Sequence, residues 1–273
     1  MAASQGNDIR IILCTIAYRD RLLDHVLDVA ADLGFDGVEI WGREPHISEQ
    51  FDENRVKAVQ RMIRQQGLMV PVLSSYLRFG CTKTRAEGTV ELEDTLHTAH
   101  CLGTEIVRVW ASDVPSAQAT EAVWEATIRQ CQQACDQASK LGITLAVEMD
   151  RRTLADSGAA ARRLAESVKR DNLRLNYHVG PDMAVQTPLE QLQSVMPYVV
   201  HMHAQNYARL TGGDEVRYMP LGDGAIDYRP LVNQLRESGY TGCIAVEFSW
   251  VEGEGKREAL AADLSYLKSL VNE

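Results

Sequence analysis

The chain alternates eight short apolar segments of strand length with eight segments of helical periodicity, and this alternation restricts its fold more than any other feature. The predicted strands are residues 9–16, 38–41, 69–73, 106–110, 144–148, 173–178, 199–203 and 243–247. The predicted helices are residues 22–33, 52–66, 90–102, 116–141, 159–168, 188–196, 228–238 and 258–271. Several of them end just before a glycine, the residue that most easily adopts the left-handed conformation found there. Eight strand–helix repeats predict an α/β fold, a single (β/α)₈ TIM barrel.

The length of the chain agrees with one such barrel. A TIM barrel typically takes about 250 residues, and no linker, low-complexity tract or charge block divides this sequence of 273 residues. We therefore expect a single domain over residues 1–273. An open doubly wound sheet is the alternative, but it needs a glycine-rich phosphate loop after the first strand. Residues 17–20 at that position are Ala-Tyr-Arg-Asp and contain no glycine.

Charge and cysteine content restrict the environment of the protein. The 38 acidic and 28 basic residues give a net charge of −10, which disfavours nonspecific binding to nucleic acid or an anionic membrane. No apolar run approaches the roughly 20 residues of a membrane span, and the polar first residues lack the apolar core of a signal peptide. We expect a cytoplasmic protein whose six scattered cysteines are reduced and mostly buried.

Four consecutive predicted strands end on a side chain that can bind a metal. These residues are Glu148, His178, His203 and Glu247. The carboxyl ends of barrel strands meet at one face, which is where TIM barrels place their active sites. Two carboxylates and two imidazoles suit Mn²⁺, Co²⁺, Zn²⁺ or Fe²⁺ better than Ca²⁺, which prefers oxygen ligands. The sequence therefore predicts one divalent metal site.

Other residues at the strand ends are candidates for binding substrate. Arg108 lies on the fourth strand, and a buried arginine requires an anionic partner. That partner is either a protein carboxylate, for which Glu39 is a candidate, or a carboxylate or phosphate of the substrate. Trp41, Tyr76 and Trp110 could form walls of a pocket and stack on a sugar ring.

Several motifs resemble the xylose-isomerase-like TIM barrel superfamily of sugar isomerases, ketose 3-epimerases, inosose dehydratases and endonuclease IV-type enzymes. They are HMHAQN at residues 201–206, PLGDGAIDY at 220–228, and the pair Gly239–Tyr240 before the last strand. The resemblance covers nearly the whole chain and implies one divalent metal ion (Mn, Co, Zn, Mg or Fe). Its ligands would be Glu148, His178, His203 and Glu247, with His178 in place of the aspartate that is usual in the family. Barrels of this family often pair, so a homodimer is one possible assembly, but the sequence does not determine the oligomeric state.

The N-terminal half is similar to bacterial 3-dehydroshikimate dehydratases, through CTIAYR at 14–19, GFDGVEIWG at 34–42 and SYL at 75–77. In that group a histidine base and a lysine stand where this chain has Asp150 and Gln205. Ketose 3-epimerases instead carry a substrate-binding arginine six residues after the strand-7 histidine, a position that Arg209 occupies here. The departures at Asp150 and Gln205 weaken the match to the dehydratase reaction.

These observations predict a metal-dependent isomerase or epimerase that removes a proton α to a carbonyl of a small polyhydroxylated substrate. Glu148 and Glu247 would each bind metal and transfer protons, with Asp150 as a third carboxylate. Gln205, Arg209 and the arginine and aromatic residues above would bind a carbohydrate or a cyclic keto acid. One alternative is a dehydratase (a lyase) acting on 3-dehydroshikimate or an inosose, and another is a catalytically degenerate binding barrel. A DNA-directed nuclease is disfavoured, because the chain is acidic and the first four strands end on no histidine or aspartate.

Overall fold

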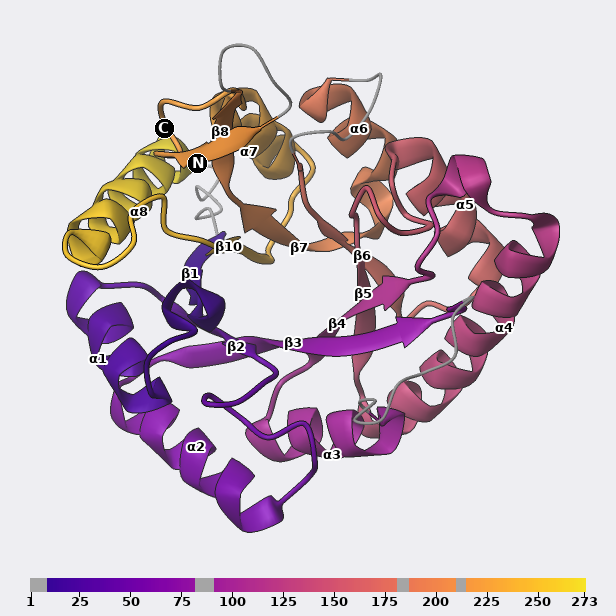
Figure 1. Cartoon of the computed structure of the whole chain (residues 1–273), viewed down its shortest axis with the longest axis horizontal. Helices are drawn as coiled ribbons and strands as arrows, with labels where there is room; N and C mark the ends of the chain where they lie inside the picture. The colour runs from indigo at the N-terminus through magenta and orange to yellow at the C-terminus, as the bar shows by residue number, and fades with distance from the viewer. Residues whose placement is uncertain (1–8, 82–90, 181–186, 210–214) are drawn as a thin grey trace, which may run out of the picture.

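Eight parallel strands close into a barrel that helices surround on the outside (Figure 1). The computed structural model describes residues 9–81, 91–180, 187–209 and 215–273. Around the barrel the strands follow the order β1-β10-β7-β6-β5-β4-β3-β2, so neighbours in the sequence are neighbours in the sheet. This closed parallel sheet confirms the predicted (β/α)₈ fold.

The elements agree closely with the predicted segments. The barrel strands are β1 (Arg10–Cys14), β2 (Gly37–Trp41), β3 (Met69–Phe79), β4 (Ile106–Ala111), β5 (Thr144–Glu148), β6 (Leu173–Tyr177), β7 (Val199–Ala204) and β10 (Cys243–Val246). The helices are α1 (Leu23–Leu33), α2 (Glu53–Gln65), α3 (Leu92–Leu102), α4 (Glu121–Ala138), α5 (Gly158–Val168), α6 (Pro188–Val195), α7 (Tyr228–Glu237) and α8 (Lys256–Asn272). Short 3₁₀ helices span Thr15–Tyr18, Ser116–Gln118, Ser139–Leu141 and Met196–Tyr198.

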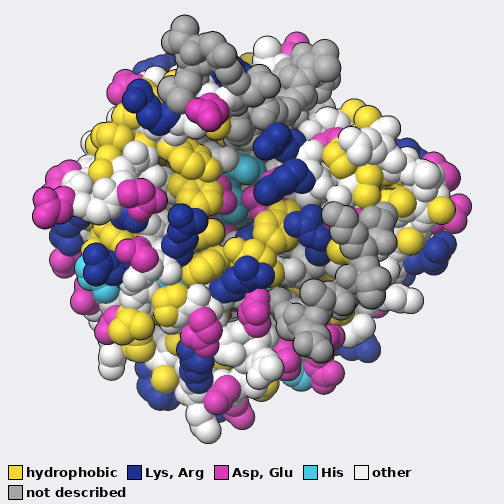
Figure 2. Space-filling view, viewed as in Figure 1, with side chains coloured by type: hydrophobic (Ala, Val, Ile, Leu, Met, Phe, Trp, Pro, Cys, Tyr) yellow, Lys and Arg dark blue, Asp and Glu magenta, His cyan; other side chains and the backbone are white. Residues whose placement is uncertain are grey.

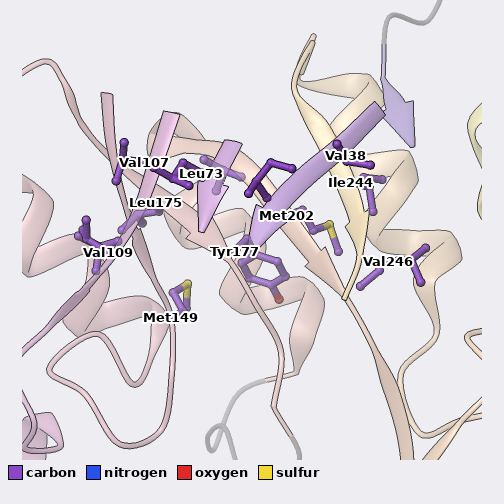
Figure 3. Close-up of a cluster of buried hydrophobic side chains, with 14 of the residues drawn as sticks. Val38, Leu73, Val107, Val109, Met149, Leu175, Tyr177, Met202, Ile244 and Val246 are labelled. Atoms are coloured by element: carbon purple, nitrogen blue, oxygen red, sulfur yellow. The ribbon is translucent and has the colours of Figure 1, made fainter. Parts of the chain in front are cut away.

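The main hydrophobic core lies between the strands and the surrounding helices. Alternate strand residues such as Val38, Val107 and Met202 belong to it, together with the apolar faces of the helices (Figure 3). Because successive side chains of a strand point to opposite faces, the residues between them point into the barrel. Helices on one face and the barrel interior on the other explain why the strands are buried on both sides.

The side chains directed into the barrel are unusually polar. This set comprises Glu39, Ser74, Arg108, Glu148, Asn176, His201 and His203, all of them buried. A smaller apolar cluster of Ile12, Cys14, Cys243 and Ala245 lies on the β1 and β10 side of the barrel. Burying so many polar groups is costly unless they bind one another or a ligand, so this interior concentrates the chemistry of the chain.

Glycines end several helices as the sequence predicts. Gly34 and Gly103 follow α1 and α3 with φ of 82° and 78°, and their N–H groups donate to carbonyls of the last helical turn. A different signal marks the start of α6, which begins with a capping box. Thr187 accepts from the Glu190 N–H, and Glu190 accepts from the Thr187 N–H. These local signals fix the helix boundaries to within a few residues.

The segment after β7, between the predicted strand at residues 199–203 and the predicted helix at 228–238, is not simply an irregular loop. It contains an antiparallel hairpin of β8 (Asn206–Arg209) and β9 (Val216–Met219). Asn206 fixes its base, because the Asn206 amide donates to the carbonyls of Leu221 and Ile226, each at 2.8 Å. Three of the four β9 residues are exposed and the fourth is half-buried. Because β9 has no buried face, its sequence shows no regular alternation of apolar and polar residues.

Two further expectations concern the cysteines and the membrane. All six cysteines lie among the described residues, none of them is in a disulfide, and four are buried. Within the described part of the chain, every helix is too short or too polar to cross a bilayer.

Candidate functional site

Three of the predicted ligands converge at the carboxyl ends of their strands. Glu148 ends β5, His203 lies near the end of β7, and Glu247 follows β10. One ligand atom from each lies within 4.8 Å of the other two. His203 Nδ1 is 3.5 Å from Glu148 Oε1 and 3.4 Å from Glu247 Oε1. A single divalent cation could contact all three side chains.

His178, the fourth predicted ligand, lies beside this group without being part of it. Its Nδ1 is 3.4 Å from Glu148 Oε1, and its Nε2 is 3.5 Å from Glu247 Oε2. Nδ1 is also 3.1 Å from the Met149 carbonyl oxygen. Because a carbonyl oxygen only accepts, Nδ1 is the donor in this contact. The side-chain amide of Gln205 lies against Nε2.

A buried carboxylate beneath the site orients His203. Glu39 on β2 accepts from His203 Nε2 at 2.9 Å and from His201 Nε2 at 2.8 Å. Burial favours a neutral Glu39, but the two imidazoles outweigh it and hold the pKa of this carboxyl well below its usual range. Burial likewise disfavours a charged His203, yet the carboxylates of Glu39 and Glu247 raise its pKa well above the ordinary value. With Nε2 bound to Glu39, Nδ1 is the atom of His203 that faces the site.

Arg108 binds Glu148 and not Glu39, the protein partner suggested by the sequence. Arg108 Nε lies 3.2 Å from Glu148 Oε2, and both Nε and Nη2 donate to Ser74 Oγ, at 3.0 and 2.6 Å. Burial acts to raise the pKa of Glu148, but Arg108 and the imidazoles of His203 and His178 lower it to about 2. Glu148 is therefore a carboxylate at neutral pH.

Asp150 forms a two-pronged ion pair with its neighbour Arg152. Arg152 Nε and Nη2 donate to the two carboxylate oxygens at 3.0 and 2.9 Å, and the Arg152 N–H adds a bond of 2.8 Å. Burial opposes this charge, but the bonds from Arg152 lower the pKa of Asp150 overall. Asp150 lies in the same cleft as Glu148 and Glu247.

Several of these groups line an open cleft of about 730 Å³. Figure 2 looks into this hollow, in which histidine and acidic side chains are surrounded by several basic ones. Four of the predicted substrate-binding residues line it: Tyr76, Arg108, Trp110 and Gln205. Trp41 is not part of this lining, but its Nε1 donates to the hydroxyl of Tyr76 at 2.7 Å. Arg209 is exposed at the end of β8 and is not part of this lining.

Other lining residues were not singled out from the sequence. Arg78 reaches the cleft because β3 continues to Phe79, beyond its predicted end at residue 73. Arg151, Tyr218 and Phe248 come from segments after β5, from β9 and after β10, and the Tyr218 and Phe248 rings stack at 5.5 Å. His201 belongs to a motif noted in the sequence, but its contact with Glu39 depends on the register of strands far apart in the chain.

The residues of the site fit a divalent cation. His203 Nδ1 and Glu247 Oε2 are buried atoms without a hydrogen-bond partner among the described residues. Unpartnered buried polar atoms are costly, and a cation bound between them, in place of a proton on His203, would remove that cost. Mixed imidazole and carboxylate donors are typical of Mn²⁺, Co²⁺, Zn²⁺ and Fe²⁺ sites.

Comparison with known proteins agrees with the fold. The family model described as "Xylose isomerase-like TIM barrel" matches residues 27–270, and the chain belongs to this family. It is 25% identical over 236 residues to the L-ribulose-5-phosphate 3-epimerase UlaE of Shigella flexneri serotype 5b (strain 8401), covering 83% of this chain and 81% of that one. The corresponding Salmonella typhi epimerase is 24% identical over 246 residues, with the same coverage of both chains.

Solved structures share the fold at lower sequence identity. The probable 3-DHS dehydratase AsbF from Bacillus anthracis has a TM-score of 0.75 at 18% identity, covering 95% of this chain and 99% of that one. A D-psicose 3-epimerase has a TM-score of 0.76 at 14% identity, with 97% and 100% covered. Similarity at this level establishes the barrel, whereas the reaction has to be argued from the residues of the site.

Proposed function

We propose that this chain is a divalent-metal-dependent isomerase or epimerase that moves a proton α to a carbonyl of a small polyhydroxylated substrate. The main support is the convergence of Glu148, His203 and Glu247 within 4.8 Å of one another, with Glu148 and Glu247 in the lining of the cleft. The relationship to enzymes named as sugar-phosphate epimerases agrees with this class of reaction. We further propose that residues 1–273 form one barrel domain.

Each residue of the site has a definite role in this proposal. Glu148, His178, His203 and Glu247 would hold the metal, which when bound would stabilise negative charge on the substrate oxygen. Glu148 Oε1 and Glu247 Oε1 lie 3.5 and 3.4 Å from His203 Nδ1, and we assign to each carboxylate the transfer of a proton at one face of the bound substrate. Arg108 keeps Glu148 ionised, as a proton acceptor must be.

The surrounding residues would bind and orient the substrate. Tyr76 and Trp110 provide aromatic walls, with ring centroids 5.3 Å apart in an edge-to-face arrangement. Gln205 lies beside His178 and offers an amide to substrate hydroxyls. Asp150, the third carboxylate, holds Arg152 at the cleft. Trp41 supports Tyr76 through its hydrogen bond to the Tyr76 hydroxyl, and Arg209 would have to reach the substrate from the hairpin.

The proposal is tested by proton exchange on metal-loaded protein. Chelated protein reloaded with Mn²⁺, Co²⁺ or Zn²⁺ is incubated with ketoses in D₂O, and NMR follows both α-deuterium incorporation and the epimer formed. Loss of a catalytic acid or base typically slows turnover about 10²–10⁴-fold, so Glu148→Gln and Glu247→Gln should lose exchange by at least that factor. Glu121→Gln is the control, since Glu121 pairs with Arg163 on the exposed outer surface.

Metal analysis provides the second half of the test. Near one metal ion per chain, lost in His178→Ala and Glu247→Ala, would support the four-ligand site. If the wild-type protein binds none of these ions, or if exchange persists in both glutamine variants, the proposed mechanism is wrong. A product that has lost water, with 3-dehydroshikimate as substrate, would identify a dehydratase.

A further inference from the structure

One side of the cleft is rich in arginine, although the chain as a whole is acidic. Four arginines and four carboxylates line the cleft: Arg78, Arg108, Arg151 and Arg152, with Asp113, Glu148, Asp150 and Glu247. The chain has a net charge of −10, so this local balance is not a consequence of composition. A divalent cation held by Glu148 and Glu247 would leave the lining with an excess of positive charge. Such a surface attracts anions.

Arg108 is one of the residues that line this cleft, and the protein itself leaves one of its donors unused. Its Nε and Nη2 bind Ser74 and Glu148, whereas Nη1 is buried without a hydrogen-bond partner among the described residues. Arg108 is only 3% exposed, and its guanidinium lies 3.9 Å from the centre of the Trp110 ring. This packing holds the guanidinium in place against the indole. A buried donor without a partner costs about 1–3 kcal/mol, which a ligand oxygen would recover.

Arg78 brings a second guanidinium to the same indole. Its Cζ lies 4.7 Å from the centre of the Trp110 ring, and its Nη1 donates to the Ser112 carbonyl at 2.9 Å. Arg78 and Arg108 therefore lie against one aromatic side chain at the edge of the cleft. Bringing two like charges to one ring is unfavourable in the free protein, and an anion near both would relieve the repulsion.

We propose that the cleft binds a substrate with a phosphate or carboxylate group, which Arg108 and Arg78 hold beside Trp110 while Arg151 and Arg152 add positive charge at the mouth. Planar guanidinium groups match both anions with paired hydrogen bonds. This inference rests on the proposed function, because it names the substrate class of the same site. It also gives the arginines a role in specificity: a neutral sugar of the same shape leaves Arg108 Nη1 unpaired.

The test compares matched anionic and neutral ligands on wild-type protein loaded with Mn²⁺. Isothermal titration calorimetry measures D-ribulose 5-phosphate against D-ribulose, and 3-dehydroshikimate against its methyl ester. In at least one pair the anionic member should bind ten-fold or more tightly, with an affinity that falls as salt is raised. The pair with the larger ratio identifies the anion as phosphate or carboxylate. Equal affinities within both pairs, or no binding in either, would overturn the inference.

Substitutions locate the anion. Arg78→Gln should weaken binding of the preferred anionic ligand about ten-fold and change its neutral partner less than two-fold. Arg163→Gln is the matched control, because Arg163 also stacks on a tryptophan, Trp124 at 4.0 Å, and pairs with Glu121 away from the cleft. Thermal unfolding of each variant checks that it is folded. Equal weakening of both ligands by Arg78→Gln would assign Arg78 a structural role and contradict the proposal.

The outcomes separate this inference from the proposed function. Selective anion binding without any proton exchange would leave the inference standing and refute the epimerase. Proton exchange on neutral ketoses, without preference for the anionic form, would support the epimerase and refute the inference.

Discussion

Glu39→Gln should weaken metal binding although residue 39 does not reach the metal site itself. Glu39 is fully buried and accepts from Nε2 of both His201 and His203, at 2.8 and 2.9 Å. Glutamine has the same shape but offers one oxygen and one N–H₂ donor. One imidazole must then face a donor, and it can do so only by moving its own proton to Nδ1. For His203, that proton would occupy the atom that faces Glu148 and Glu247.

The expected magnitude follows from the role of such outer carboxylates. Removing the hydrogen-bond partner of a metal-binding histidine typically costs 10–100-fold in metal affinity, which corresponds to about 1.4–2.8 kcal/mol. Because Glu39→Gln also removes a buried negative charge close to the bound cation, we expect a loss near the upper end of this range. Calorimetric titration of chelated protein with Co²⁺ at one fixed pH measures it directly.

Two controls make this result interpretable. Glu121→Gln removes an exposed carboxylate paired with Arg163 and should bind Co²⁺ as the wild-type protein does. Urea unfolding of the chelated proteins shows whether Glu39→Gln remains folded. A folded Glu39→Gln protein with wild-type Co²⁺ affinity would refute the role assigned to Glu39.

Two further predictions concern stability. Burial raises the pKa of Asp263, which accepts from the Leu221 N–H at 2.8 Å, to about 6 from 3.8. The contribution of this group to the free energy of unfolding is therefore present below about pH 4 and lost as pH rises through about 6. The stability of Asp263→Asn relative to the wild type should therefore increase between pH 4 and 7. The pKa difference limits this increase to about 3 kcal/mol. Urea unfolding of both proteins at several pH values measures it, and a stability difference that does not change with pH would contradict the prediction. Gly80→Ala should cost about 2–4 kcal/mol, because φ is +71° and the new Cβ would lie 1.9 Å from Thr127 Oγ1. Gly67→Ala, with φ of +70° and open space around it, should show only the smaller backbone cost in the same assay.

The sequence alone determines the barrel and the end of the barrel at which its chemistry lies. Apolar segments of strand length, helical periodicity and glycines such as Gly34 are local signals, each readable within about 15 residues. The parallel topology follows because each strand must cross over through a helix to reach the next. The convergence of Glu148, His203 and Glu247 follows in turn, since in a closed parallel barrel all strands end at one face.

Only the tertiary structure decides which of these side chains contact one another. Period-two alternation places Glu39 and Arg108 inside the barrel, but the stagger between strands sets their heights. Arg108 therefore meets Glu148, and Glu39 meets the histidines of a strand more than 160 positions later. The continuation of β3 that carries Arg78 to the cleft, and the hairpin after β7, likewise depend on packing between distant segments. Local propensity is set within one segment, whereas register is set by all eight strands closing together.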